Sequence, residues 1–112
     1  MHHIFPVNQF EELSSYVENI IALTPGQHYL EAHPNGNTQI IDKGFQQICL
    51  LAKADHIEEN IKYGKEVIYS FDDFIYVLTI GLDNNKYTEI DDMDFKEVVR
   101  QINIDYVDVK NG

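Results

Sequence analysis

Hydrophobic residues are concentrated in residues 66–82, which read EVIYSFDDFIYVLTIGL. This stretch is rich in Val, Ile, Tyr and Phe, and its only internal charges are Asp72 and Asp73. β-Branched and aromatic residues favour strands, and alternation places apolar side chains on both faces of the second half. The stretch is therefore predicted to form a central hairpin, residues 66–82, with other layers packed on both of its faces.

In the N-terminal half, apolar spacing predicts a helix followed by a short hairpin. Asn8 can cap a helix with apolar residues at positions 10, 13, 17, 20 and 21, and Pro25-Gly26 can end it. Residues 27–33 and 38–42 flank an Asn-Gly turn, which is the strongest local signal for a hairpin.

On either side of the central stretch, further elements follow from the same spacing rules. Residues 44–54 are predicted to be helical, with a second short helix that Asp55 caps and Gly64 ends. Residues 83–85 are turn formers, and 86–90 is predicted as a strand.

At the C-terminal end, Asp91 or Asp92 is expected to cap a helix with Phe95, Val98, Val99 and Ile102 facing inward. Residues 104–109 are predicted as an edge strand, because charges interrupt both of its faces. The expected fold is one α+β domain, residues 1–112, with about three helices and a mixed or antiparallel sheet. Its predicted order is α-β-β-α-(α)-β-β-β-α-β.

The net charge of the chain limits the kinds of molecule that can bind it. The chain has 19 acidic and 8 basic residues among 112, a net charge of -11. Such a field repels nucleic acid and anionic membranes and attracts basic proteins or divalent cations. The N-terminus lacks a targeting pattern, and the single cysteine, Cys49, lies in an apolar helical context. We therefore expect a cytoplasmic protein with a buried, reduced thiol.

None of the candidate metal-binding or catalytic motifs has the residues at the positions that its site requires. Residues 83–94 resemble a calcium loop in their oxygen ligands, but Thr88 stands where glycine is needed and Asp94 where glutamate is needed. The five histidines, His2, His3, His28, His33 and His56, lack zinc or metalloprotease spacing. Cys49 lacks the electropositive surroundings that a nucleophile requires. The sequence therefore predicts no catalytic residue, no metal site and no cofactor.

Acidic and aromatic residues alternate toward the C-terminus, where residues 71–112 hold ten acids and four bases. One interpretation is that the rings fill the core and the acids solvate turns. The other is an anionic interaction surface with tyrosine anchors. On that second interpretation, the partner-binding residues are Asp72, Asp73, Tyr87, Glu89, Asp91, Asp92, Asp94, Asp105, Tyr106 and Asp108.

The size of the chain and the segment Lys86-Tyr-Thr-Glu-Ile-Asp-Asp-Met-Asp94 resemble the small acidic immunity proteins that neutralise bacterial nuclease toxins. That resemblance implies a non-catalytic inhibitor that covers a basic active site, with a toxin nuclease domain as its partner. An alternative is a phage-type nucleic-acid mimic that blocks a restriction or CRISPR effector. A further alternative is a small enzyme or metal-binding protein built on the histidines.

Overall fold

The computed structural model describes residues 2–22 and 43–107. Within these residues the chain has three α-helices and a two-stranded antiparallel sheet, so the α+β class is confirmed at this level. The helices are α2 (Lys43–Tyr63), α3 (Phe71–Gly81) and α4 (Phe95–Asp105). Strands β1 (His2–His3) and β2 (Ile20–Ile21) pair with His2 opposite Ile21. Short 3-10 helices are η1 (Glu11–Leu13), η2 (Val17–Asn19) and η5 (Asn85–Glu89).

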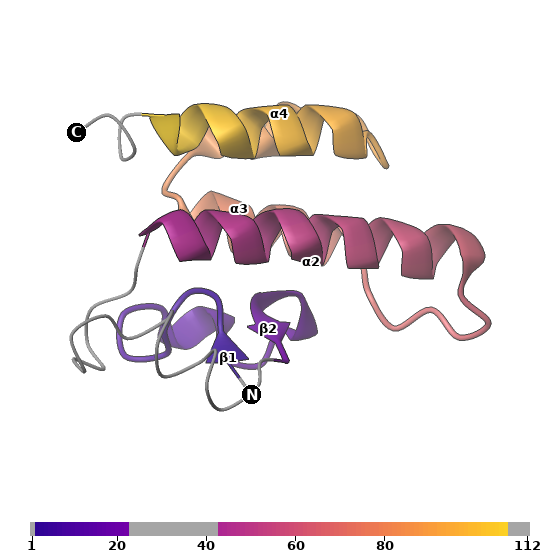
Figure 1. Cartoon of the computed structure of the whole chain (residues 1–112), viewed down its shortest axis with the longest axis horizontal. Helices are drawn as coiled ribbons and strands as arrows, with labels where there is room; N and C mark the ends of the chain where they lie inside the picture. Colours follow the sequence, from indigo (N-terminus) through magenta and orange to yellow (C-terminus); the bar gives the residue numbers. More distant parts are fainter. Residues whose placement is uncertain (1, 23–42, 108–112) are drawn as a thin grey trace.

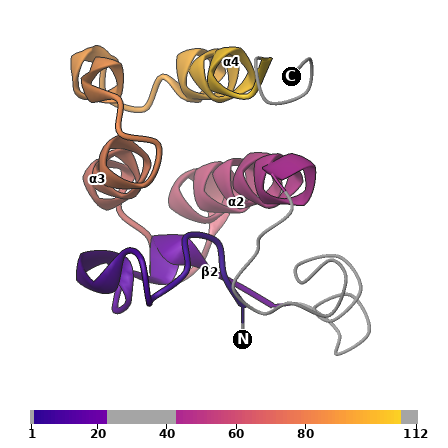
Figure 2. The same cartoon turned by 90° about the vertical axis from the view of Figure 1, so that its left-hand side faces the viewer.

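The elements form three layers (Figures 1 and 2). The N-terminal segment with the small sheet lies on one side, α2 and α3 lie in the middle, and α4 with the preceding η5 segment lies on the other side. Helix α2 packs on α4, while α3 contacts both η5 and η2. The largest fully buried side chains come from all three layers, and they include Phe5, Leu50, Phe74, Tyr87 and Ile102.

The predicted central hairpin, residues 66–82, is wrong. Residues 71–81 form α3, and the residues before it form an irregular connection. The buried residues of α3 are Phe71, Phe74, Val77 and Leu78, which recur at helical and not at alternating spacing. Ser70 caps the helix, because its Oγ accepts a hydrogen bond from the Asp73 amide at 3.3 Å.

The helix predicted after Asn8 is also wrong, since η1, η2 and β2 occupy that region. The buried Asn19 side chain accepts from the Phe5 amide at 2.8 Å and donates to the carbonyls of Phe5 and Leu13. An asparagine side chain that bonds the backbone in this way competes with a continuous helix. The Pro25-Gly26 stop and the hairpin of residues 27–33 and 38–42 lie outside the described residues.

The two helices predicted on either side of Asp55 form one continuous helix, α2, so Asp55 is not a cap. The stop at Gly64 is confirmed. Its amide donates to the Asn60 carbonyl at 2.9 Å, and a Cβ at position 64 would lie 2.6 Å from that oxygen. A similar close approach occurs at Gly81, where a Cβ would lie 2.4 Å from the Phe5 ring.

The C-terminal helix is confirmed as α4, with Phe95, Val98 and Ile102 buried. Its cap is Asp94 and not Asp91 or Asp92, which lie three and two residues earlier, and the Asp94 side chain accepts from the Glu97 amide. The strand predicted at 86–90 is wrong, because residues 85–89 form η5 under an Asn84 cap. The edge strand predicted at 104–109 is wrong where it is described, since Ile104 and Asp105 end α4.

Candidate functional site

The starts of α3 and α4 meet and carry exposed acids. Phe71 and Phe95 are the first residues of these helices, and their rings contact edge to face with centroids 5.1 Å apart. Asp72 and Asp73 follow Phe71. The turn before Phe95 brings further carboxylates to the same end of the two helices. We call the exposed acids at these starts and on the η5 segment that leads to α4 the acidic surface: Asp72, Asp73, Glu89, Asp91, Asp92 and Asp94.

Local backbone chemistry places these acids. Acidic residues are favoured in the first turn of a helix, because the unsatisfied amides and the helix dipole give that end a partial positive charge. Asp94 uses this directly as a cap, whereas Asp91 and Asp92 precede it in a tight turn. Met93 in that turn has a φ of 65°, which turns the chain sharply and leaves both flanking carboxylates exposed.

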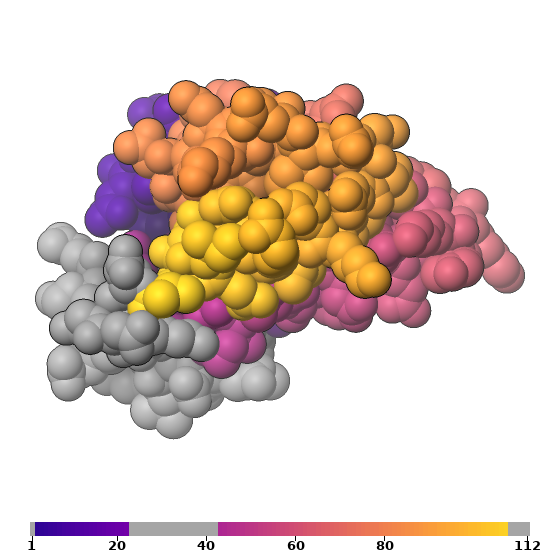
Figure 3. Space-filling model, turned by 90° about the horizontal axis from the view of Figure 1, so that it is seen from above, coloured from indigo at the N-terminus to yellow at the C-terminus, as the bar shows by residue number. Residues whose placement is uncertain are grey.

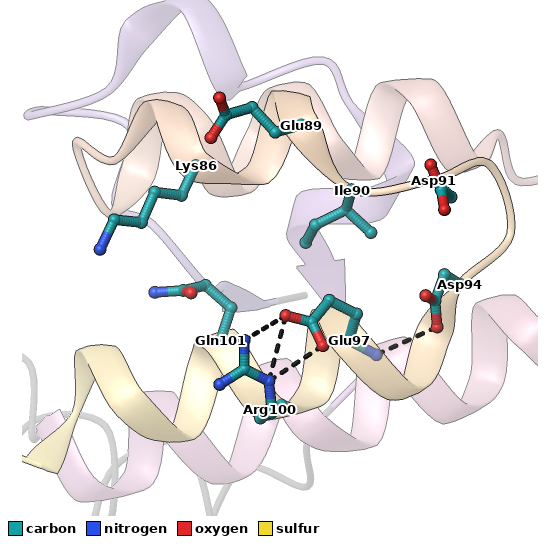
Figure 4. Close-up of a pocket in the computed structure, with 8 residues that line it drawn as sticks. All are labelled: Lys86, Glu89, Ile90, Asp91, Asp94, Glu97, Arg100 and Gln101. Carbon is teal, nitrogen blue, oxygen red and sulfur yellow. Dashed lines mark hydrogen bonds and ion pairs between the residues drawn. The ribbon is translucent and has the colours of Figure 1, made fainter.

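A groove of about 430 Å³ runs between η5 and α4 (Figure 4). Glu89 and Asp91 lie on one side of it, and Asp94 and Glu97 on the other, with Asp91 and Asp94 together at the end near the start of α4. The remaining lining residues are Lys86, Ile90, Arg100 and Gln101. Four acids against two bases make the groove anionic. Figure 3 shows α4 and the segment before it side by side on one face of the molecule.

The acids of the acidic surface are not neutralised by neighbouring cations. Across residues 2–22 and 43–107, the ion pairs are Lys62–Glu58 and Arg100–Glu97. The Arg100 Nε donates to both carboxylate oxygens of Glu97, and this hydrogen bonding lowers the pKa of Glu97 and raises that of Arg100. Arg100 is thereby engaged by Glu97, so the acidic surface retains its charge.

Two predicted site residues, Tyr87 and Asp105, lie in an internal network instead. Tyr87 is completely buried, and its hydroxyl donates to the Asp105 carboxylate at 2.8 Å. Asn84 Nδ2 and Gln101 Nε2 donate to the same carboxylate at 3.0 and 2.9 Å. This network ties the end of α3 and η5 to the last turn of α4, so these two residues hold the fold together.

Tyr106 is also inside the fold. It is 2% exposed, and its hydroxyl donates to the Gln46 Oε1 atom, which links the end of α4 to α2. Burial raises the pKa of Tyr106, and burial together with the Asp105 hydrogen bond raises the pKa of Tyr87. Because neither ring is exposed, we leave both tyrosines out of the acidic surface. Asp108 lies outside the described residues.

Sequence reasoning missed a second exposed feature at the end of α2. Tyr63, Val67 and Ile68 are exposed to 80%, 56% and 59% respectively. The predicted hairpin places Val67 in a sheet, and the sequence assigns no role to Tyr63. A helix start at Ser70 would have exposed this error, since Ser70-Phe71-Asp72-Asp73 has the capping pattern of Ser or Thr followed three residues later by an acid.

Nothing in the described part of the chain gathers three or more His, Cys, Asp or Glu side chains in a way that could hold a metal ion. Cys49 is buried, as expected, and burial raises the pKa of its thiol to about 11. A thiol with this pKa is a poor nucleophile near neutral pH. No helix in residues 2–22 or 43–107 has the length and apolar character needed to cross a membrane.

Comparison of the chain with protein-family models, with curated proteins and with solved structures found no match.

Proposed function

We propose that the chain is a non-catalytic inhibitor that binds a basic protein, and that it acts in the cytoplasm as an immunity protein against a cationic nuclease-type toxin. The observation that supports this most is the acidic surface, six exposed carboxylates around the starts of α3 and α4 that lack an ion-pair partner among the described residues. Carboxylates in this state can pair with the lysines and arginines that hold phosphate in a nuclease.

Steering by charge gives this surface a mechanism. A net charge of -11 attracts a basic partner over long range, and the local carboxylates then orient it. An inhibitor of this kind needs no cofactor and no catalytic group, because it acts by covering the active site of its partner. We expect no direct binding of nucleic acid, because 19 acidic against 8 basic residues give the chain a net charge that repels phosphate.

The proposal predicts a specific partner. The tagged chain, purified from its native host at low salt, should retain a basic protein, and expression of that protein alone should stop growth while co-expression with the chain restores it. Nuclease activity of the purified partner should fall to zero at one equivalent of the chain. A retained partner that is a restriction or CRISPR effector would support the nucleic-acid mimic instead. A partner whose activity is unchanged by saturating amounts of the chain would contradict inhibition altogether.

A further inference from the structure

The end of α2 and the connection to α3 form an exposed apolar tip, defined by Tyr63, Val67 and Ile68. Figure 1 shows that α2 extends beyond the start of α4 and that the connection to α3 turns back beside the end of α2. Three large apolar side chains within six residues of sequence are thus more than half exposed, and exposed apolar residues that gather together mark interaction sites on proteins. Singly exposed apolar residues elsewhere, such as Val17 at 45%, need no such explanation.

Hydrogen bonds to a single side chain, that of Asn60, fix the backbone of the connection beside the tip. Asn60 Oδ1 accepts from the amides of Ile68 and Tyr69 at 2.9 and 3.3 Å, and its Nδ2 donates to the Glu66 carbonyl at 3.0 Å. At the far end of the connection, the Ser70 amide donates to the buried Glu18 carboxylate at 2.9 Å. A connection fixed at both ends loses little conformational entropy when it binds, which favours affinity.

Tyr69, next to the tip, faces the interior instead. The Lys53 Nζ atom donates to the Tyr69 hydroxyl at 2.7 Å and lies 4.3 Å from the centre of its ring. This contact anchors the connection on α2, and Lys53 is itself 4% exposed. The chain therefore directs one aromatic residue of this region inward while leaving Tyr63, Val67 and Ile68 exposed.

The charge around the tip indicates what would cover it. Residues 55–73 hold six acids, Asp55, Glu58, Glu59, Glu66, Asp72 and Asp73, and two bases, Lys62 and Lys65. Lys62 is already paired with Glu58. An apolar centre with an anionic surround matches a protein surface that has an apolar recess bordered by Lys and Arg, and it disfavours an anionic membrane.

We infer that the tip of Tyr63, Val67 and Ile68 is the apolar anchor with which the chain docks into a recess of its basic protein partner, while the adjacent acidic surface pairs with the border of that recess. This inference rests on the proposed function, because it takes the same partner. It assigns the two features separate tasks: the carboxylates set the rate of association, and the apolar side chains set the lifetime of the complex.

The test uses the basic protein that the tagged chain retains from its native host, purified and identified by mass spectrometry. Binding kinetics are measured for Tyr63→Ser, Ile68→Ser and the control Val17→Ser, which changes an apolar side chain 45% exposed in the N-terminal layer. Tyr63→Ser and Ile68→Ser should each raise Kd at least tenfold, mainly through faster dissociation, with an unchanged dependence on salt. Val17→Ser should stay within twofold of the parent. Circular dichroism should show that all three variants retain the parent fold, since each position is exposed.

A second measurement locates the contact directly. With the photo-cross-linker benzoylphenylalanine in place of Ile68, the chain should cross-link to a partner peptide adjacent to Lys or Arg, whereas the same group in place of Val17 should not cross-link to the partner.

The outcomes separate the two proposals. One outcome is that binding depends on salt, that Tyr63→Ser and Ile68→Ser keep Kd within twofold of the parent, and that position 68 gives no cross-link. This outcome would overturn the role of the tip as an anchor and leave the inhibitor function standing. A retained partner that docks through the tip but is not inhibited would overturn the inhibitor function and leave the tip standing. Retention of no basic protein would overturn both. A dimer of the chain alone in sedimentation that Ile68→Ser converts to a monomer would show that a second copy occupies the tip, and would overturn the inference.

Discussion

Asp105 is the residue on which the C-terminal layer depends. Its carboxylate accepts hydrogen bonds from three side chains, those of Asn84, Tyr87 and Gln101. These donors come from the segment after α3, from η5 and from α4 itself. Loss of an acceptor that several donors share lowers the free energy of unfolding, because each donor has given up its hydration on folding and is left without a hydrogen bond.

The hydroxyl of Tyr87 is the simplest part of this network to remove. Tyr87→Phe keeps the buried ring and deletes one hydrogen bond to a charged acceptor, so we expect the free energy of unfolding to fall by about 1.5–3 kcal/mol. Urea denaturation measures this change. Tyr63→Phe, at a position 80% exposed, is the matched control and should change stability by less than about 0.5 kcal/mol.

The same hydroxyl predicts how stability responds to alkaline pH. Burial raises the pKa of Tyr87 above its ordinary value of 10.0, so the folded state holds the proton more tightly than the unfolded state. The contribution of Tyr87 is complete below pH 10.0 and is lost as pH rises above it, because the unfolded state then releases its proton first. In thermal unfolding measured above that pH, Tyr87→Phe should lose stability less steeply than the parent. Equal slopes for the two proteins would contradict this assignment.

Cys49 gives a test of the core. Its side chain is 2% exposed, and burial raises its pKa to about 11. We expect a thiol reagent to label the native protein slowly at pH 8 and the denatured protein at once, because the reagent needs both access and thiolate. Rapid labelling of the native protein would place Cys49 outside the core and would reopen a catalytic role for it.

Among the helices, α3 depends on the Ser70 cap at its start. Ser70→Ala removes the Oγ that accepts from the Asp73 amide, and it should lower stability by about 1 kcal/mol. Ser15→Ala is the control, since Ser15 is exposed in a turn and no side-chain cap depends on it. Equal melting temperatures for the two variants would show that the start of α3 does not rely on this cap.

How far the sequence predicts each element depends on whether its local signals agree. For α4, an acidic cap precedes a helical spacing of apolar residues, and the prediction is confirmed apart from the choice of cap. For α3, β-branched and aromatic residues favoured a strand, whereas the spacing of Phe71, Phe74, Val77 and Leu78 and the Ser70 cap favoured a helix. The structure follows spacing and capping, because helical packing against the other layers buries one face of that segment.

The N-terminal segment could not be predicted from local signals. Its spacing was helical, but the long-range hydrogen bonds of Asn19 to Phe5, across 14 residues, divide it into short turns and a strand. Such contacts depend on which distant residues the fold brings together, and no single window of sequence contains both partners.

For the molecule as a whole, the sequence predicts that the candidate site is acidic, but it does not predict which large side chains are exposed. The exposed positions of Asp91, Asp92 and Asp94 follow from their place before a helix, which the sequence predicts. Tyr87 and Tyr106 are buried, whereas Tyr63, Val67 and Ile68 of the tip are exposed. A tyrosine that is amphipathic can serve either role, and its burial is decided by tertiary packing that composition does not contain.

The rate of association at varied salt measures directly whether charge steers the partner to the acidic surface. The measurement compares two double variants: one carries Asp91→Asn and Asp92→Asn, and the other carries Glu11→Gln and Glu12→Gln. Each removes two exposed charges, and the two pairs lie on opposite outer layers of the fold. Screening acts over about 10 Å at roughly 0.1 M salt, so the parent should associate with its basic partner fast at low salt and markedly more slowly as salt rises.

The aspartate pair should lower the low-salt association rate at least about threefold and flatten its dependence on salt, while leaving the dissociation rate near that of the parent. The glutamate pair should act only through the net charge and therefore have the smaller effect. Glu18 is excluded from this control because it is buried and accepts from the Ser70 amide. An association rate that ignores salt, or a glutamate pair that slows association more than the aspartate pair does, would contradict the acidic surface as the recognition face.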